Sequence, residues 1–175
     1  FREHGRFSHQ PTMYDEVLNV PIVLEGTEQI DHPDASGLQK EQVELLDIAP
    51  TVVDLMDAPV PKSYRGRSLL DVIDSGEDVD VISETWSNDE YKLSIRTASW
   101  KYIWDRDTDT RELYDLVSDP KERENVLDEN PEESAKLHDQ LTDHLQQLRA
   151  TNETLPEVAM DAETETRLKD LGYLE

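Results

Sequence analysis

Histidine and arginine side chains gather at the start of the chain. His4 and His9 lie in this segment, and Arg2 and Arg6 flank His4. Residues 1–11 show no helical or strand period and predict a loop. The whole chain carries a net charge of −24, so a locally cationic loop indicates an anionic ligand such as sulfate or phosphate. An ordinary surface loop is the alternative, because two histidines and two arginines can meet by chance.

The other clusters of reactive side chains have simpler explanations. The alternating aspartates of residues 105–109 have the spacing that opens an EF-hand calcium loop. Thr110, however, stands where that loop needs Gly, and Leu116 where it needs a bidentate Glu. An acidic hairpin turn is therefore predicted. The chain has no Gly-x-Ser-x-Gly, phosphate-binding glycine loop or His-x-x-x-His motif, so no intact catalytic constellation and no metal site are expected.

The composition limits the classes of partner. Acidic residues number 41 against 17 basic ones, yet apolar residues recur periodically, which disordered acidic tails do not show. We interpret this as a protein adapted to high salt, from a halophilic archaeal source. Its field repels nucleic acid and anionic membranes, so neither is an expected partner. No apolar run approaches the ~20 residues of a membrane span, and a soluble protein is expected, with the cytoplasm as the favoured compartment.

Cysteine and the first residue give two further limits. The chain contains no cysteine, which excludes disulfides, thiolate metal ligands and a cysteine nucleophile within it. The sequence starts with Phe1 rather than Met. We therefore expect a fragment or a processed product.

The elements that position the cationic loop follow it directly. Residues 12–18 predict a short helix capped by Thr12. Residues 20–24 are a continuous apolar run, which predicts a strand buried on both faces of a sheet. Residues 47–57 predict a helix with Pro50 in its first turn. Its buried stripe is expected to comprise Ile48, Val52, Leu55 and Met56.

The second half of the chain predicts an antiparallel sheet with a helical cover. Side chains alternate over residues 91–96 and 100–105, and residues 97–99 are short enough to join two strands as a hairpin. Residues 112–116 predict a third strand. One sheet face is rich in aromatic residues and needs a cover, which we expect from a helix over residues 131–150 with its stripe of leucines.

Five ordered blocks of this sequence resemble the sulfatase family. The first block contains His-Gly, then Tyr-Asp-Glu, then Val-Pro-Ile-Val, and the others resemble the family's Asp-Ile-Ala-Pro-Thr helix, Gly-x-Ser-Leu-Leu, closing sheet and chain ending. The blocks are residues 4–23, 47–55, 66–70, 96–125 and 167–174. The resemblance covers nearly the whole chain, and it is a resemblance to the C-terminal part of a sulfatase.

The resemblance implies an α/β fold. The chain would form an alkaline-phosphatase-like remnant, consisting of the edge of a mixed sheet and helices, with a small C-terminal antiparallel sheet packed by a helix. Three segments are expected: the C-terminal part of the main α/β domain, a connecting helix with the small sheet, and the C-terminal helices. Their bounds are residues 1–60, 61–128 and 129–175.

The resemblance also implies a sulfuric ester hydrolase. The family's nucleophile is a formylglycine made from Cys or Ser in a Cys/Ser-x-Pro-x-Arg motif, and its metal is calcium or another divalent ion held by N-terminal aspartates and Asp-His-Gly-Glu. These motifs do not occur here, so the 175 residues alone are expected to be inactive and to hold no cofactor. The family's sulfate-contacting Lys or His, four or five residues before the Tyr, corresponds to His9. His4 and Arg6 are the further substrate-binding candidates.

Two alternative functions remain open. The same superfamily includes phosphate and phosphonate ester hydrolases, and only the nucleophile separates them from sulfatases. The chain could also be a non-catalytic interaction module derived from a truncated sulfatase. An uncovered sheet edge would then call for self-association or for the missing N-terminal half.

Overall fold

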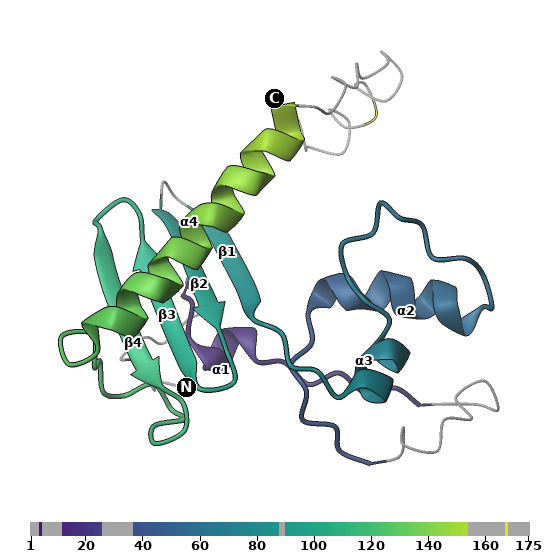
Figure 1. Cartoon of the computed structure of the whole chain (residues 1–175), viewed down its shortest axis with the longest axis horizontal. Coiled ribbons are helices and arrows are strands. Elements are labelled where there is room, and N and C mark those ends of the chain that lie inside the picture. The colour runs from purple at the N-terminus through teal and green to yellow at the C-terminus, as the bar shows by residue number, and fades with distance from the viewer. Residues whose placement is uncertain (1–3, 5–11, 26–36, 88–89, 154–166, 168–175) are drawn as a thin grey trace. The chain divides into compact units, whose positions relative to one another are not determined.

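The computed structural model describes residue 4, residues 12–25, 37–87 and 90–153, and residue 167 (Figure 1). The chain divides into two units, residues 1–141 and 142–175. The elements are α1 (Asp15–Leu18), the 3₁₀ helix η1 (Leu45–Asp47), α2 (Ile48–Leu55), α3 (Leu69–Ser75), β1 (Val81–Ser87), β2 (Glu90–Arg96), β3 (Trp100–Asp105), β4 (Thr110–Asp115) and α4 (Pro131–Glu153). No helix within the described ranges is long and apolar enough to cross a membrane.

The four strands form one antiparallel sheet in the order β1-β2-β3-β4. The predicted hairpin connection is confirmed, because the Thr97 amide donates to the Trp100 carbonyl at 2.8 Å. The acidic turn between β3 and β4 is confirmed as well. There the Asp105 carboxylate accepts the Asp107 and Thr108 amides at 3.1 and 3.2 Å, which is the local side-chain capping that favours Asp in turns.

One face of the sheet is apolar and aromatic. Ile95 of β2, Tyr102 of β3 and Leu113 of β4 stand opposite one another across these strands and are at most 1% exposed. The first part of α4 covers this face (Figure 1), where Leu137 is fully buried and the His138 ring meets Trp104 edge-on with centroids 4.6 Å apart. The predicted helical cover is confirmed.

The opposite face mixes apolar and charged side chains and receives the N-terminal segment. Met13 packs there with Ile103, Tyr114 and Leu116 in one buried cluster, against which Leu18 also packs. Because side chains alternate across a strand, Lys101 lies on this face between residues that point the other way. One face of the sheet is therefore covered by the first part of α4, and the opposite face binds the segment that follows the cationic loop.

Two N-terminal predictions are wrong. Residues 20–24 form no strand, and Val20 and Val23 are 53% and 84% exposed. No strand in the described part of the chain pairs with this run, and an unpaired extended segment has no hydrogen-bonded ladder. The helix begins at Asp15 rather than after Thr12, with Tyr14 as its N-cap residue.

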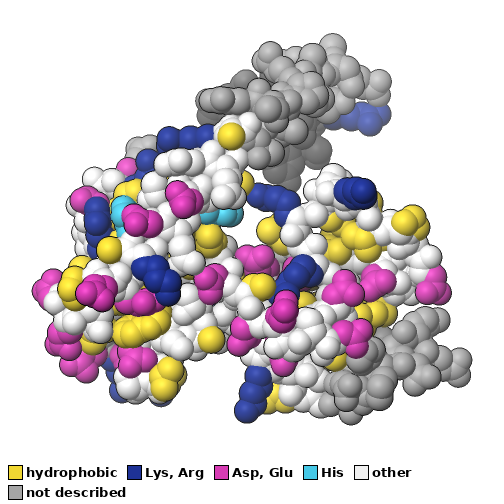
Figure 2. All heavy atoms as spheres, in the orientation of Figure 1, with side chains coloured by type: hydrophobic (Ala, Val, Ile, Leu, Met, Phe, Trp, Pro, Cys, Tyr) yellow, Lys and Arg dark blue, Asp and Glu magenta, His cyan; other side chains and the backbone are white. Residues whose placement is uncertain are grey.

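Helix α2 begins almost where predicted, but the expected buried stripe is wrong. Ile48, Val52 and Met56 are 43%, 51% and 73% exposed, whereas Thr51 is 1% exposed. The packing of α2 uses the other side of the helix. The Thr51 hydroxyl accepts the Leu69 amide of α3 at 2.9 Å, and no described element covers the apolar side. Figure 2 shows hydrophobic side chains gathered over α2.

The α/β fold class agrees with the described helices and sheet. The segment boundaries at residues 60 and 128 stay a prediction.

Candidate functional site

His4 is the one candidate substrate residue that the structure describes. His9 and Arg6 lie outside the described residues, and their contact with an anion stays a prediction. The His4 ring stacks on Tyr14 with centroids 3.6 Å apart and planes 9° apart. Its Nδ1 lies 2.8 and 3.0 Å from the two Glu16 carboxylate oxygens, and its Nε2 lies 2.7 Å from the Glu122 carbonyl oxygen.

Both ring nitrogens of His4 therefore face acceptors. Both nitrogens can donate at the same time only when the imidazole carries both protons. Burial alone would lower the pKa of His4, but the Glu122 carbonyl and the Glu16 carboxylate outweigh it and raise the pKa above its ordinary value. In these contacts His4 is a cationic link between α1 and the loop after β4.

This arrangement does not fit the divalent metal that the sulfatase resemblance implies. Ligand atoms of His4, Glu16 and Glu122 lie within 4.8 Å of one another. A histidine ligand must offer a free nitrogen lone pair, and here both nitrogens are directed at protein acceptors. Calcium moreover takes 6–8 oxygen ligands, which these residues do not supply. The three residues form a hydrogen-bonded group rather than a metal site.

Asp15, the first residue of α1, binds two cationic side chains of the sheet. Its Oδ1 accepts from Lys101 Nζ at 2.6 Å, and its Oδ2 accepts from Arg96 Nε at 3.0 Å. Arg96 also donates to the side-chain oxygen of Gln42. Burial would raise the pKa of Asp15, but the two cations outweigh burial and lower it. Asp15 is thus held as a carboxylate.

Glu122 completes the group from the loop between β4 and α4. It is 1% exposed and adopts a φ of 53°, a conformation that costs a non-glycine residue about 1–2 kcal/mol. Its Oε2 accepts the Asp15 amide at 2.7 Å, and its Oε1 lies 3.3 Å from Lys101 Nζ. The latter contact is an ion pair without hydrogen-bond geometry. Burial raises the pKa of Glu122, and Lys101 opposes that rise.

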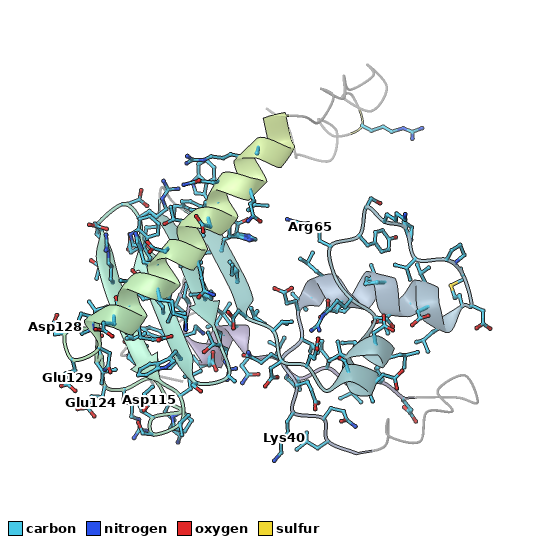
Figure 3. All side chains as sticks on the ribbon, viewed as in Figure 1. Lys40, Arg65, Asp115, Glu124, Asp128 and Glu129 are labelled. Carbon is cyan, nitrogen blue, oxygen red and sulfur yellow. The ribbon has the colours of Figure 1, made fainter. Side chains whose placement is uncertain are left out.

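We call Asp15, Lys101 and Glu122 the anchor cluster. The Lys101 side chain is 1% exposed, so two carboxylates and one ammonium share an almost dry site. Figure 3 labels Asp115, the last residue of β4, and Glu124, which follows Glu122 by two positions.

Two tyrosine hydroxyls bind one carboxylate on the same side of the sheet. Tyr14 and Tyr114 both donate to Oε2 of Glu112, at 2.9 and 2.8 Å. Burial and this carboxylate raise the pKa of Tyr14 to about 12, so the hydroxyl remains a donor at neutral pH. Tyr14 is consequently fixed on both sides, by Glu112 through its hydroxyl and by His4 through its ring.

The sequence offered little warning of the anchor cluster. Lys101 stands at a position of its strand where the alternation predicts a solvent-exposed side chain. Glu122 stands two residues after Pro120 in a loop rich in acidic residues. The available signal was the charge of Lys101 between Trp100 and Tyr102, two residues with buried or half-buried side chains. Fold context was needed to show that its partners come from segments far away along the chain.

Comparison with known proteins decides the family. Residues 2–151 match the family described as N-sulphoglucosamine sulphohydrolase, C-terminal. The chain belongs to this sulfatase family. Human arylsulfatase K is 30% identical over 154 residues, which cover 79% of this chain and 28% of that protein. The delta 4,5-hexuronate-2-O-sulfatase of Bacteroides thetaiotaomicron is 29% identical over 137 residues, covering 70% and 27%.

A solved sulfatase structure agrees with this assignment. A 2-O GAG sulfatase superposes with a TM-score of 0.54 at 25% identity, covering 67% of this chain and 27% of that one. The predicted resemblance to the C-terminal part of a sulfatase is thereby confirmed for the four blocks within residues 2–151, and the block at residues 167–174 stays a prediction. The chain spans a little over a quarter of the length of these sulfatases.

Proposed function

We propose that this chain serves as the C-terminal region of a sulfatase that hydrolyses sulfate esters of sugars. The match to the sulfatase C-terminal family over residues 2–151 carries the proposal. The names of the relatives favour a sugar substrate, because one is a hexuronate-2-O-sulfatase and another a 2-O GAG sulfatase. A sulfated uronic acid or amino sugar is accordingly the proposed substrate class.

In this proposal the cationic loop supplies the sulfate side of the active site. His9 and Arg6 would donate to sulfate oxygens, where charge-assisted hydrogen bonds are strongest. The contacts of His4 with Glu16 and Glu122 support a role in orienting that loop. The nucleophile and a divalent metal, calcium in the first instance, would be held by residues outside this chain. The metal would neutralise charge on the sulfate oxygens.

The exposed side of α2 supports a partner segment. Leu45 of η1 is 69% exposed, and Ile48, Val52 and Met56 extend the apolar surface along α2. Surfaces of this kind are normally covered in the working protein. We propose that the N-terminal part of the sulfatase covers it, with self-association as the alternative. Light scattering of the 175 residues and of the complete protein, with and without molar KCl, separates the two. A monomer of the 175 residues in both conditions contradicts self-association, whereas association of the 175 residues that the complete protein does not show supports coverage by the N-terminal part.

Hydrolysis assays on the complete protein test the function. We expect the complete protein to release sulfate from a 2-O-sulfated hexuronate disaccharide, and we expect no release by the 175 residues alone. Replacing His9 or Arg6 by Ala should lower kcat/KM by roughly 10- to 100-fold, the effect of losing one hydrogen bond to a charged group. The matched control is Lys40→Ala, because Lys40 is an exposed basic residue elsewhere on the chain (Figure 3). Turnover of phosphate esters but not of sulfate esters would assign the chain to the phosphatase branch instead.

A further inference from the structure

Glu122 contacts two residues that lie on either side of Arg6 and His9 in the sequence. Its backbone carbonyl accepts from His4 at 2.7 Å, and its carboxylate accepts the Asp15 amide at 2.7 Å. His4 and Asp15 are eleven residues apart, and Arg6 and His9 lie between them in the sequence. One residue from the loop after β4 thus contacts the chain both before and after Arg6 and His9 in the sequence.

The sheet fixes the same segment a second time. Lys101 of β3 and Arg96 of β2 bind the two separate oxygens of the Asp15 carboxylate, at 2.6 and 3.0 Å. An amide and two carboxylate oxygens of one residue are thereby held by three side chains. Such a set of contacts determines the translation of α1 on the sheet and also its rotation, which a hydrophobic contact alone does not.

Buried charge is an unusual means of merely holding a helix in place. Buried ion pairs are often no more stabilising than well-packed apolar residues of similar volume, and their best-attested benefit is a defined geometry. Glu122 also keeps a φ of 53°, and backbone conformations of this kind persist where surrounding contacts over-determine them, commonly near functional sites. The hydrophobic cluster of Met13 and Ile103 already attaches this segment to the sheet.

We propose that Asp15, Lys101 and Glu122 are positioning residues, which hold His4 and α1, the described residues on either side of Arg6 and His9, in place for the sulfatase active site. The inference rests on the proposed sulfatase function. The small antiparallel sheet is then the support on which the sulfate-binding side of the site is aligned. Glu122 contacts both His4 and Asp15, and Lys101 pairs with the carboxylates of Asp15 and Glu122.

The test is Asp15→Asn in the complete enzyme. This change keeps the shape of the side chain and leaves the Lys101–Glu122 pair intact, but it removes the charge and one acceptor. The matched control is Asp105→Asn on β3. Asp105 is also a carboxylate near a lysine of the sheet, 3.8 Å from Lys92, and its other hydrogen bonds are to the amides of its own turn, Asp107 and Thr108.

Three measurements separate positioning from stability. Hydrogen exchange of the peptide over residues 12–20 should accelerate at least about tenfold in Asp15→Asn, the scale of one lost charge-assisted hydrogen bond, while the peptide over residues 100–105 stays protected. For a sulfated sugar, kcat/KM should fall about 10- to 100-fold, the usual effect of a misplaced substrate contact. The inhibition constant of inorganic sulfate should rise together with KM.

The outcomes distinguish the two hypotheses. If the enzyme hydrolyses sulfate esters but Asp15→Asn leaves KM and sulfate inhibition as in Asp105→Asn, the positioning role is refuted. Unchanged exchange at residues 12–20 refutes it too, whatever the activity. If no sulfate ester is turned over by the wild type, the proposed function fails, and the exchange data alone judge whether the cluster fixes the segment.

Discussion

Replacing Lys101 by Met tests the energetics of the anchor cluster most directly. The change removes the ammonium group that pairs with the Glu122 carboxylate, and it leaves the Asp15 carboxylate paired with Arg96. Glu122 and Lys101 are each 1% exposed, so water cannot replace the lost partner. Breaking a buried ion pair in this way costs about 3–5 kcal/mol, and we expect a loss of that size in the stability of the sheet.

The second variant distinguishes lost attraction from an unpaired buried charge. In Lys101→Met/Glu122→Gln the uncompensated carboxylate is gone, while the new amide oxygen can still accept the Asp15 amide. The double variant should therefore be less destabilised than the sum of the two single variants, by about 1–3 kcal/mol of coupling. Lys136→Met is the control, because Lys136 is 61% exposed and pairs with Glu133 on the surface of α4. Its cost should stay within about 0.5 kcal/mol.

Native-state hydrogen exchange of the β3 amides in the complete protein is the appropriate assay. It reports the opening free energy of this sheet without assuming that the whole protein unfolds in one step. A cost below about 1 kcal/mol for Lys101→Met, in the range of exposed pairs, would refute the claim that the site is dry. Simple additivity in the double variant would refute the claim that Lys101 and Glu122 interact directly.

Three further predictions concern His4, Asp47 and Gly66. The folded pKa of His4 is raised above the ordinary value of 6.5. The contribution of protonated His4 to stability is therefore complete below pH 6.5 and is lost as the pH rises through the folded pKa. The Tm of the wild type should exceed that of His4→Gln by more at about pH 5.5 than at about pH 8.5. Asp47 accepts the Glu44 and Arg67 amides at 2.9 and 2.7 Å, so Asp47→Ala should cost about 2–4 kcal/mol by leaving both amides unpaired. The measurement is faster hydrogen exchange in α2, with the exposed Asp71→Ala as control. A Cβ on Gly66 would lie 2.1 Å from the Leu46 carbonyl oxygen, so Gly66→Ala should cost about 1–3 kcal/mol and lower the Tm, whereas Gly76→Ala should affect the backbone conformation without any clash.

Much of the sheet could be predicted because its determinants are local. The alternation of Tyr102 and Trp104 with Lys101 places aromatic rings on one face, and the short Thr97–Ser99 connection permits only neighbouring antiparallel strands. The spacing of Leu137 and Leu141 then supplies a covering helix, and both are fully buried. The same reasoning failed at residues 20–24, because an apolar run forms a strand only where another strand pairs with it.

The candidate site was predictable in its chemistry but not in its geometry. The cationic character around His4 could be recognised from the side chains alone. Its binding partners could not, since Glu122 lies 118 residues away along the chain. The exposed stripe of α2 shows the same limit, because periodicity identifies an apolar face and does not say what covers it.

The sequence by itself determined the membership of the sulfatase family and the alternation that builds the sheet, since both reside in residue types at fixed spacing. Only the tertiary structure decided that Asp15, Lys101 and Glu122 meet in one buried cluster. Asp15 reaches Lys101 across 86 positions and Glu122 across 107. The physical reason is that desolvation makes such charges costly unless they are paired, and pairing across that separation exists only once the sheet and the N-terminal segment have come together.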